Sequence, residues 1–348
     1  MKARSLAILL LSTLALSLRA DEVDDLVRAN MEEGHITGLA LGICIDGELV
    51  ERRVYGLANL ETRTTVKPET VFKIASMSKA FCSTAVMMLV EEGKLSLEDK
   101  VSDLLPNTPA AWSEIRLKHL LSHTSGIPDV PDFSFTRQYT RDEFLALYAD
   151  LKLQEEPGST YRYNNFGYAT LGLIVGEVTG KPLREFVTER ILQPLGMNAT
   201  HYYDMAKIVP NRAYGYDWTA NGQVNVNPVR PYVYDGSGGL LTNLLDYAQW
   251  DKALRNDTLI KRETKEMMFT KFTLNDGTAG TYGFGWMPGS FDGERVVSHS
   301  GGTLGFTSYY LRGLESGVSV FVFRNGNTGR PSDLARSVFT IIKKRRGR

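Results

Sequence analysis

The stretch 71–79 reads Val-Phe-Lys-Ile-Ala-Ser-Met-Ser-Lys and leads from an extended apolar segment into a long apolar helix. Ser76 is the only serine of the chain that is followed three residues later by a lysine, Lys79. Three residues make about one helical turn, so both side chains lie on one face. An amine beside a hydroxyl accepts its proton and makes the oxygen a nucleophile, and N–H groups at a helix start stabilise an oxyanion. We therefore expect a nucleophilic serine where the strand turns into the helix.

Strand-like segments lie near both ends of the chain, and helical segments lie between them. Apolar runs bounded by turn residues predict strands at 38–46, 49–55, 294–299, 306–312 and 318–323. The dipeptide Asp46-Gly47 predicts a tight hairpin between the first two strands. Apolar spacing and glycine stops predict helices at 21–33, 79–92, 141–151, 167–178, 183–192, 242–254 and 332–342.

This order of elements predicts an α/β fold of the α+β type. The strands from the two ends form a mainly antiparallel sheet flanked by the terminal helices, and a mostly helical lobe is inserted between them. We place the sheet lobe at about 21–70 and 283–348 and the helical lobe at about 71–282. The cleft between the lobes is the expected place of an active site.

The charge balance argues against a nucleic-acid partner, because 40 basic and 40 acidic residues give a formal net charge of 0. A short basic start and an apolar run from 6 to 16 are typical of a secretory signal peptide over residues 1–20. The run is short for a spanning helix, and an uncleaved anchor is the alternative. We expect a secreted or periplasmic protein, with residues 21–348 as its domain and no stable membrane insertion after cleavage.

Two further motifs carry polar groups suited to a cleft. Tyr163-Asn164-Asn165 follows a Pro-Gly turn and precedes a helix that we expect to begin near Phe166, so a phenol and an amide face the same side. The phenol is a plausible proton carrier. The run His299-Ser300-Gly301-Gly302 ends a predicted strand, where its glycines let a substrate approach closely.

Together these three motifs resemble those of the serine β-lactamase and penicillin-binding-protein superfamily. A Tyr-x-Asn second motif is similar to that of the class C β-lactamase branch, with its D,D-peptidase and family VIII esterase relatives. The flanking runs at 117–127, 238–240 and 299–306 also resemble this branch. The resemblance covers about residues 38–325.

The resemblance implies a role for each motif residue. Ser76 is the acylated nucleophile, and Lys79 and Tyr163 share the proton transfers; the residues alone do not decide which of the two is the base. Asn165 binds the amide side of the substrate. Backbone N–H groups of Ser76 and Gly302 form the oxyanion hole.

His299 stands where β-lactamases usually carry lysine. We expect it, with Ser300, Gly301 and Gly302, to bind substrate, and a charged His299 would attract a substrate carboxylate. The alternative is a structural residue that orients Ser300 or the strand edge. Histidine here is more similar to D,D-peptidases, and it argues against an efficient β-lactamase.

The expected function is that of a serine hydrolase cleaving an ester or amide, as an esterase or a D-amino-acid or D,D-peptidase, with weak β-lactamase activity as an option. The alternative is a penicillin-binding sensor that is acylated with little turnover. The substrate is a small molecule, peptidoglycan-derived or a β-lactam among the options. No cofactor is expected.

Four other residues have mainly structural interpretations. His119 and His123 are four residues apart, but no third ligand pairs with them in the sequence, so we expect no metal site. Cys44 and Cys82 lie in apolar segments, and we expect buried thiols rather than a disulfide.

Overall fold

The computed structural model describes residues 21–131, 133–204, 206–226 and 231–347, and the predicted signal peptide lies outside this range. Its centre is a seven-stranded sheet with the order β3-β2-β1-β12-β11-β10-β9, in which every neighbouring pair is antiparallel. This confirms the predicted fold class. The strands are β1 (Gly38–Ile45), β2 (Glu48–Asn59), β3 (Thr64–Thr65), β9 (Met287–Phe291), β10 (Glu294–Thr303), β11 (Phe306–Gly313) and β12 (Val318–Arg324).

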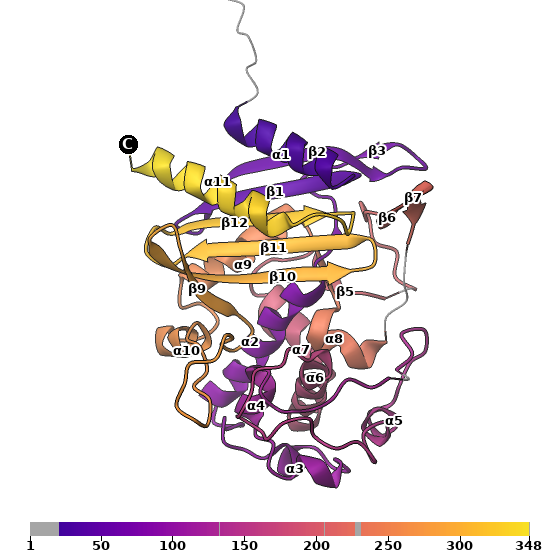
Figure 1. The fold of residues 1–348 in the computed structure, drawn as a ribbon, viewed down its shortest axis with the longest axis vertical. Coiled ribbons are helices and arrows are strands. Elements are labelled where there is room, and N and C mark those ends of the chain that lie inside the picture. The colour runs from indigo at the N-terminus through magenta and orange to yellow at the C-terminus, as the bar shows by residue number, and fades with distance from the viewer. Residues whose placement is uncertain (1–20, 132, 205, 227–230, 348) are drawn as a thin grey trace, which may run out of the picture.

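Helices α1 (Glu22–Glu33) and α11 (Pro331–Arg346) cover one face of this sheet (Figure 1). The side chains of β1 alternate between two cores, as the period of a strand requires. Leu39 and Leu41 pack with Val27 of α1 in one core, whereas Ala40 and Cys44 belong to the core on the opposite face. Because both faces are covered, β1 is buried along almost its whole length.

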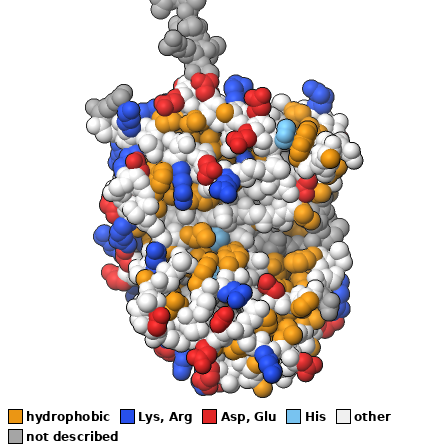
Figure 2. Space-filling view, in the orientation of Figure 1, with side chains coloured by type: hydrophobic (Ala, Val, Ile, Leu, Met, Phe, Trp, Pro, Cys, Tyr) orange, Lys and Arg blue, Asp and Glu red, His pale blue; other side chains and the backbone are white. Residues whose placement is uncertain are grey.

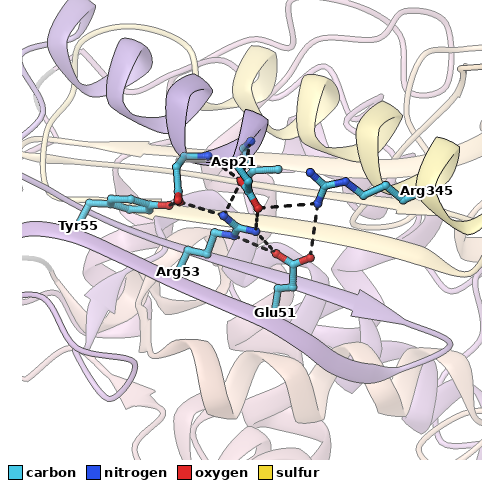
Figure 3. Close-up of polar contacts among 7 residues, drawn as sticks. Asp21, Glu51, Arg53, Tyr55 and Arg345 are labelled. Carbon is cyan, nitrogen blue, oxygen red and sulfur yellow. Dashed lines mark hydrogen bonds and ion pairs between the residues drawn. The ribbon is translucent and has the colours of Figure 1, made fainter. Parts of the chain in front are cut away.

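An ion-pair cluster ties the start of α1 to the sheet and to the end of α11 (Figure 3). Asp21 caps α1 by accepting hydrogen bonds from two backbone N–H groups. Arg53 of β2 donates to Asp21 at 2.7 and 2.8 Å and to Asp24 at 2.9 Å, and it also contacts Glu51. The guanidinium lowers the pKa of Asp21 to about 2. Arg345 of α11 approaches the carboxylates of Asp21 and Glu51.

The helical part of the chain lies against the other face of the sheet (Figure 1). Helix α2 runs away from the sheet through the centre of this helical part. Nearly every residue of α2 is buried, so this helix is the core around which the others pack. The remaining elements are β4 (Phe72–Lys73), the 3-10 turn η1 (Ala75–Met77), α2 (Ser78–Glu91), α3 (Val101–Leu104), η2 (Ala110–Trp112), α4 (Leu117–Leu121), α5 (Arg141–Ala146), α6 (Asn165–Thr179), α7 (Leu183–Val187), the π turn η3 (Thr188–Leu192), β5 (His201–Tyr202), β6 (Tyr216–Thr219), β7 (Gly222–Asn225), η4 (Tyr232–Tyr234), α8 (Asp235–Gly238), β8 (Leu240–Thr242), α9 (Leu244–Arg255) and α10 (Arg262–Met268).

Several predicted boundaries of helices and strands were wrong. The helix expected at 141–151 ends at Ala146, and the one expected at 183–192 changes to a π turn after Val187. The last helix continues past 342 through the basic run to Arg346, where cationic side chains suit the negative end of the helix dipole. Strand β10 continues to Thr303 because β11 pairs with it that far.

No described helix combines the length and the hydropathy that crossing a bilayer requires. Cys44 and Cys82 are buried free thiols.

Candidate active site

Ser76 lies in η1, on a tight turn between β4 and α2. The preceding residue, Ala75, has a φ of 47°, which is uncommon for a residue with a side chain. Two contacts hold this turn: Ile74 N–H donates to the carbonyl of Leu240, and Ser78 Oγ donates to the carbonyl of Ala75 at 2.7 Å. Ala75 and Met77 are buried while Ser76 is partly exposed. The turn therefore presents the Ser76 side chain on its open side.

Lys79 is completely buried beside the serine. Its Nζ lies 3.2 Å from Ser76 Oγ, and it donates to Asn165 Oδ1 and to the carbonyl of Ser237, each at 2.7 Å. The last two oxygens only accept, so both bonds are donated by Lys79, and they hold its amine beside the Ser76 hydroxyl. Lys79 is thus placed to take the proton of the serine as the oxygen attacks.

The Tyr163-Asn164-Asn165 segment lies against the same lysine. Lys79 Nζ is 4.8 Å from the centre of the Tyr163 ring. Asn164 caps α6 by accepting from the N–H of Gly167 at 2.8 Å, so the helix begins at Asn165, one residue before the expected start. The structure therefore brings Ser76, Lys79, Tyr163 and Asn165 together, as the resemblance implies.

The end of β10 forms one wall of the site. Strand β9 pairs with β10 only as far as Ser298, whereas β11 pairs with β10 as far as Thr303. On the β9 side, residues 299–303 of β10 therefore have no strand partner in the described part of the chain. Such an edge accepts an extended peptide backbone. Ser300 and Gly302 are exposed, and the molecule is hollowed across the middle of this face, with hydrophobic side chains along the lower side of the hollow (Figure 2).

The two glycines of this edge have different environments. A Cβ on Gly301 would lie 2.1 Å from the carbonyl oxygen of Ile74 and 2.2 Å from Ser308 Oγ, so only glycine lets the Ser76 turn pack on β10. A Cβ on Gly302 would meet nothing within 4 Å among the described residues. The first glycine serves packing, and the second faces open space.

The environment of His299 differs from the one expected from the sequence. Its ring is 1% exposed, its Nδ1 lies 2.6 Å from the carbonyl of Ser300, and its Nε2 lies 2.7 Å from Tyr282 Oη. Nδ1–H therefore donates to the carbonyl, and Nε2 accepts from the tyrosine. Burial, together with the charge of Lys79, lowers the pKa of His299 to about 3. The structure does not support the expected charged partner of a substrate carboxylate; it favours the alternative of a residue that orients the strand edge.

The sequence did not single out Ser237 or Tyr282 as parts of this site. Ser237 contributes its backbone carbonyl, for which a side chain gives no signal. Tyr282 lies in a run rich in glycine and aromatic residues at 280–286, which was the available clue.

In the pair His119 and His123, each Nδ1 accepts from a backbone N–H at 3.1 Å, which is a structural use of the ring.

Comparisons with known proteins give a consistent result. A profile of the Beta-lactamase family matches residues 23–341. A penicillin-binding protein of Bacillus subtilis is 30% identical over 300 residues, which is 80% of this chain. Protein flp of Staphylococcus aureus is 28% identical over 334 residues, which is 92% of this chain. The chain spans 66% of the length of each of these relatives.

Solved structures with the same fold include the octameric penicillin-binding protein homologue from Pyrococcus abyssi, with a TM-score of 0.79 and 30% identity over 92% of this chain and 76% of that one. The D-amino acid amidase from Ochrobactrum anthropi SV3 also has a TM-score of 0.79, over 93% of this chain and 98% of the amidase. Its identity is 23%, and this likeness shows the fold.

Proposed function

This chain belongs to the beta-lactamase family of serine hydrolases, and we propose that it works through an acyl-enzyme formed on Ser76. The observation that carries the proposal is the triple contact of the buried Lys79 amine with Ser76 Oγ, Asn165 Oδ1 and the Ser237 carbonyl. A general base must lie within hydrogen-bond reach of the proton that it removes, and the 3.2 Å between Lys79 Nζ and Ser76 Oγ meets that condition.

The reaction has two halves. Ser76 Oγ attacks the carbonyl carbon of an ester or amide while its proton passes to the Lys79 and Tyr163 pair, and the oxyanion takes up hydrogen bonds from the N–H groups of Ser76 and Gly302. The bond to the leaving alcohol or amine then breaks as that group receives the proton. Water attacks the acyl-enzyme in the second half and releases the acid and free Ser76.

The preferred substrate is an ester, or an amide of a D-amino acid or peptide, rather than a β-lactam. A neutral, buried His299 supports this choice, because no cation stands at the position where β-lactamases usually carry lysine. The fold shared with a D-amino acid amidase supports an amide. The unpaired edge at 299–303 supports an extended substrate, and a peptidoglycan-derived peptide has that form. The apolar run before Asp21 supports secretion or a periplasmic location.

A second candidate function is a penicillin-binding sensor that is acylated and hydrolyses slowly. The names of the Bacillus subtilis and Pyrococcus abyssi relatives favour it. The two candidates differ only in the rate of deacylation, so a burst of product followed by almost no turnover would identify the sensor.

The direct test is a substrate panel on the purified protein. It consists of nitrocefin, p-nitrophenyl esters of two chain lengths, D-phenylalanine amide and a D-Ala-D-Ala peptide, each with wild type and Ser76→Ala. We expect a higher kcat/KM for an ester or a D-amino-acid substrate than for nitrocefin, and none of these activities in Ser76→Ala. A nitrocefin kcat/KM above all others would reverse the proposed preference.

A further inference from the structure

His123 lies outside the catalytic groups named so far, yet it contacts both neighbours of Tyr163. Its Nδ1 accepts from the N–H of Asn164 at 3.1 Å, and its backbone carbonyl accepts from the N–H of Arg162 at 2.8 Å. Its ring also packs on the Tyr163 ring, with centroids 4.3 Å apart. One residue therefore holds the backbone on both sides of Tyr163 and the face of its side chain.

The local backbone explains how one residue does this. His123 has a φ of 59°, a left-handed conformation that histidine adopts more readily than most residues with a side chain. The residues that follow extend the same contact, since Thr124 accepts from the N–H of Gly158 at 2.7 Å and Ile127 accepts from Asn164 Nδ2 at 2.9 Å. The segment 123–127 thus lies along 154–164 and supports the loop that carries Tyr163.

The state of the ring is fixed by its partners. Because Nδ1 accepts a hydrogen bond, the proton of the neutral ring is on Nε2, which is buried with no hydrogen-bond partner among the residues described. The rings of Tyr161, Tyr168 and Tyr282 surround it. Burial and the nearby charge of Lys79 hold the pKa of His123 well below its usual range, so the ring is an acceptor and no acid. A phenyl ring of similar shape would remove the unpartnered polar atom but would lose the bond to Asn164.

We propose that His123 is the positioning residue of Tyr163: it holds the phenol beside Lys79 and acts on the reaction only through that group. This inference rests on the proposed role of Tyr163 in proton transfer. Misplacement by about 1 Å of a group that transfers a proton costs on the order of 10²-fold in rate, although the group itself is unchanged.

Three substitutions separate the two contacts of the side chain. His123→Asn keeps an acceptor near the Nδ1 position and tolerates the positive φ. His123→Phe keeps the ring and loses the acceptor, and His123→Ala loses both. His119→Asn is the matched control, because the buried His119, four residues before His123, makes the same type of Nδ1 contact with the N–H of Arg116. Its ring packs on Phe272, whereas that of His123 packs on Tyr163.

The readouts are kcat and KM on the best ester of the panel, with melting temperatures to compare folding. For His123→Ala we expect kcat to fall on the order of 10²-fold with KM changed by less than about threefold. His123→Asn should recover at least about tenfold of that loss, and His119→Asn should keep wild-type kcat within about twofold. Equal kcat losses in the Asn, Phe and Ala variants of His123, or in His119→Asn, would overturn the inference, because they would report general destabilisation.

A double-mutant cycle decides whether His123 acts through Tyr163. In a Tyr163→Phe background, His123→Ala should lower kcat by less than about threefold further, because the group that His123 positions is already gone. Losses that multiply would contradict the inference. If Tyr163→Phe alone leaves kcat unchanged while Ser76→Ala abolishes activity, the proposed proton-transfer role of Tyr163 fails. An unchanged kcat in Tyr163→Phe thus argues against the proton-transfer role of Tyr163, whereas multiplying losses argue only against the positioning role of His123.

Discussion

Lys79 and Asn165 are 86 positions apart in the chain, yet the amine of the first donates to Oδ1 of the second at 2.7 Å. The bond joins the start of α2, which follows the Ser76 turn, to the start of α6, which follows Tyr163. Asn165 therefore helps to hold the Lys79 amine beside Ser76 Oγ.

The first prediction concerns this bond. In Asn165→Asp a carboxylate replaces the amide oxygen and stabilises the ammonium form of Lys79. A smaller fraction of Lys79 would then carry the lone pair that removes the serine proton, so we expect kcat/KM near pH 7 to fall on the order of 10²-fold and to recover partly as pH rises. A pH–rate profile measures this. A profile parallel to that of wild type would show that Asn165 does not control the state of Lys79.

The second prediction concerns Lys79 and Tyr163 as one proton-transfer unit. Lys79→Ala and Tyr163→Phe should each cost much of kcat/KM, and the double variant should cost little more than the worse single one, because groups that act together are not additive. Rate constants of the three variants on one ester are sufficient. Multiplication of the two single losses would indicate independent roles.

The third prediction uses the two neighbouring glycines as a matched pair. Gly301→Ala forces a Cβ to 2.1 Å from the Ile74 carbonyl, so we expect a loss of on the order of 2–4 kcal/mol in the free energy of unfolding. The Cβ of Gly302→Ala meets no atom of the described residues within 4 Å, so its free energy of unfolding should lie within about 0.5–1 kcal/mol of wild type. If substrate lies over this edge, Gly302→Ala should nevertheless raise KM.

Denaturant unfolding and steady-state kinetics measure both variants. Equal stability of the two proteins would show that the Ser76 turn does not pack on Gly301 as closely as described. An unchanged KM in Gly302→Ala would place the substrate elsewhere.

Most of the frame of this site could be predicted from the sequence, because it depends on local patterns. The spacing of Ser76 and Lys79 and the order of strands and helices are such patterns, and the sheet and the grouping of Ser76, Lys79, Tyr163 and Asn165 agree with them. The buried position and the hydrogen bonding of His299 could not be predicted, because they depend on tertiary contacts such as the one with Tyr282, 17 residues away in the sequence. Helix ends were missed where the chain continues in turns with i→i+3 hydrogen bonds, as after Ala146, because apolar spacing does not separate such turns from a helix.

The fourth prediction concerns acid stability. Burial lowers the pKa of His119 to about 4 and that of His299 to about 3, whereas an unfolded histidine titrates near ~6.5. A lowered folded-state pKa means that the contribution to stability is complete above about pH 6.5 and is lost as pH falls toward the folded-state value. Each such histidine should therefore lower the free energy of unfolding by about 1–2 kcal/mol between pH 6.5 and pH 5.

His119→Asn keeps an acceptor without a titrating group, so its free energy of unfolding should fall less than that of wild type between pH 6.5 and 5. Urea unfolding at several pH values makes the comparison. A variant with the same pH slope as wild type would show that His119 is not held neutral. Asp21, with a pKa of about 2, adds a separate loss only below about pH 4.

The central claim is that Ser76 carries the acyl group. The most direct measurement is intact mass and peptide mapping after incubation with a fluorophosphonate and, separately, with a penicillin. We predict one adduct per chain on the peptide that contains Ser76 and no adduct in Ser76→Ala. Ser300→Ala, which removes the exposed serine on the β10 edge, should still be labelled at Ser76. An adduct that persists in Ser76→Ala, or that maps to another residue of the wild-type protein, would contradict the account.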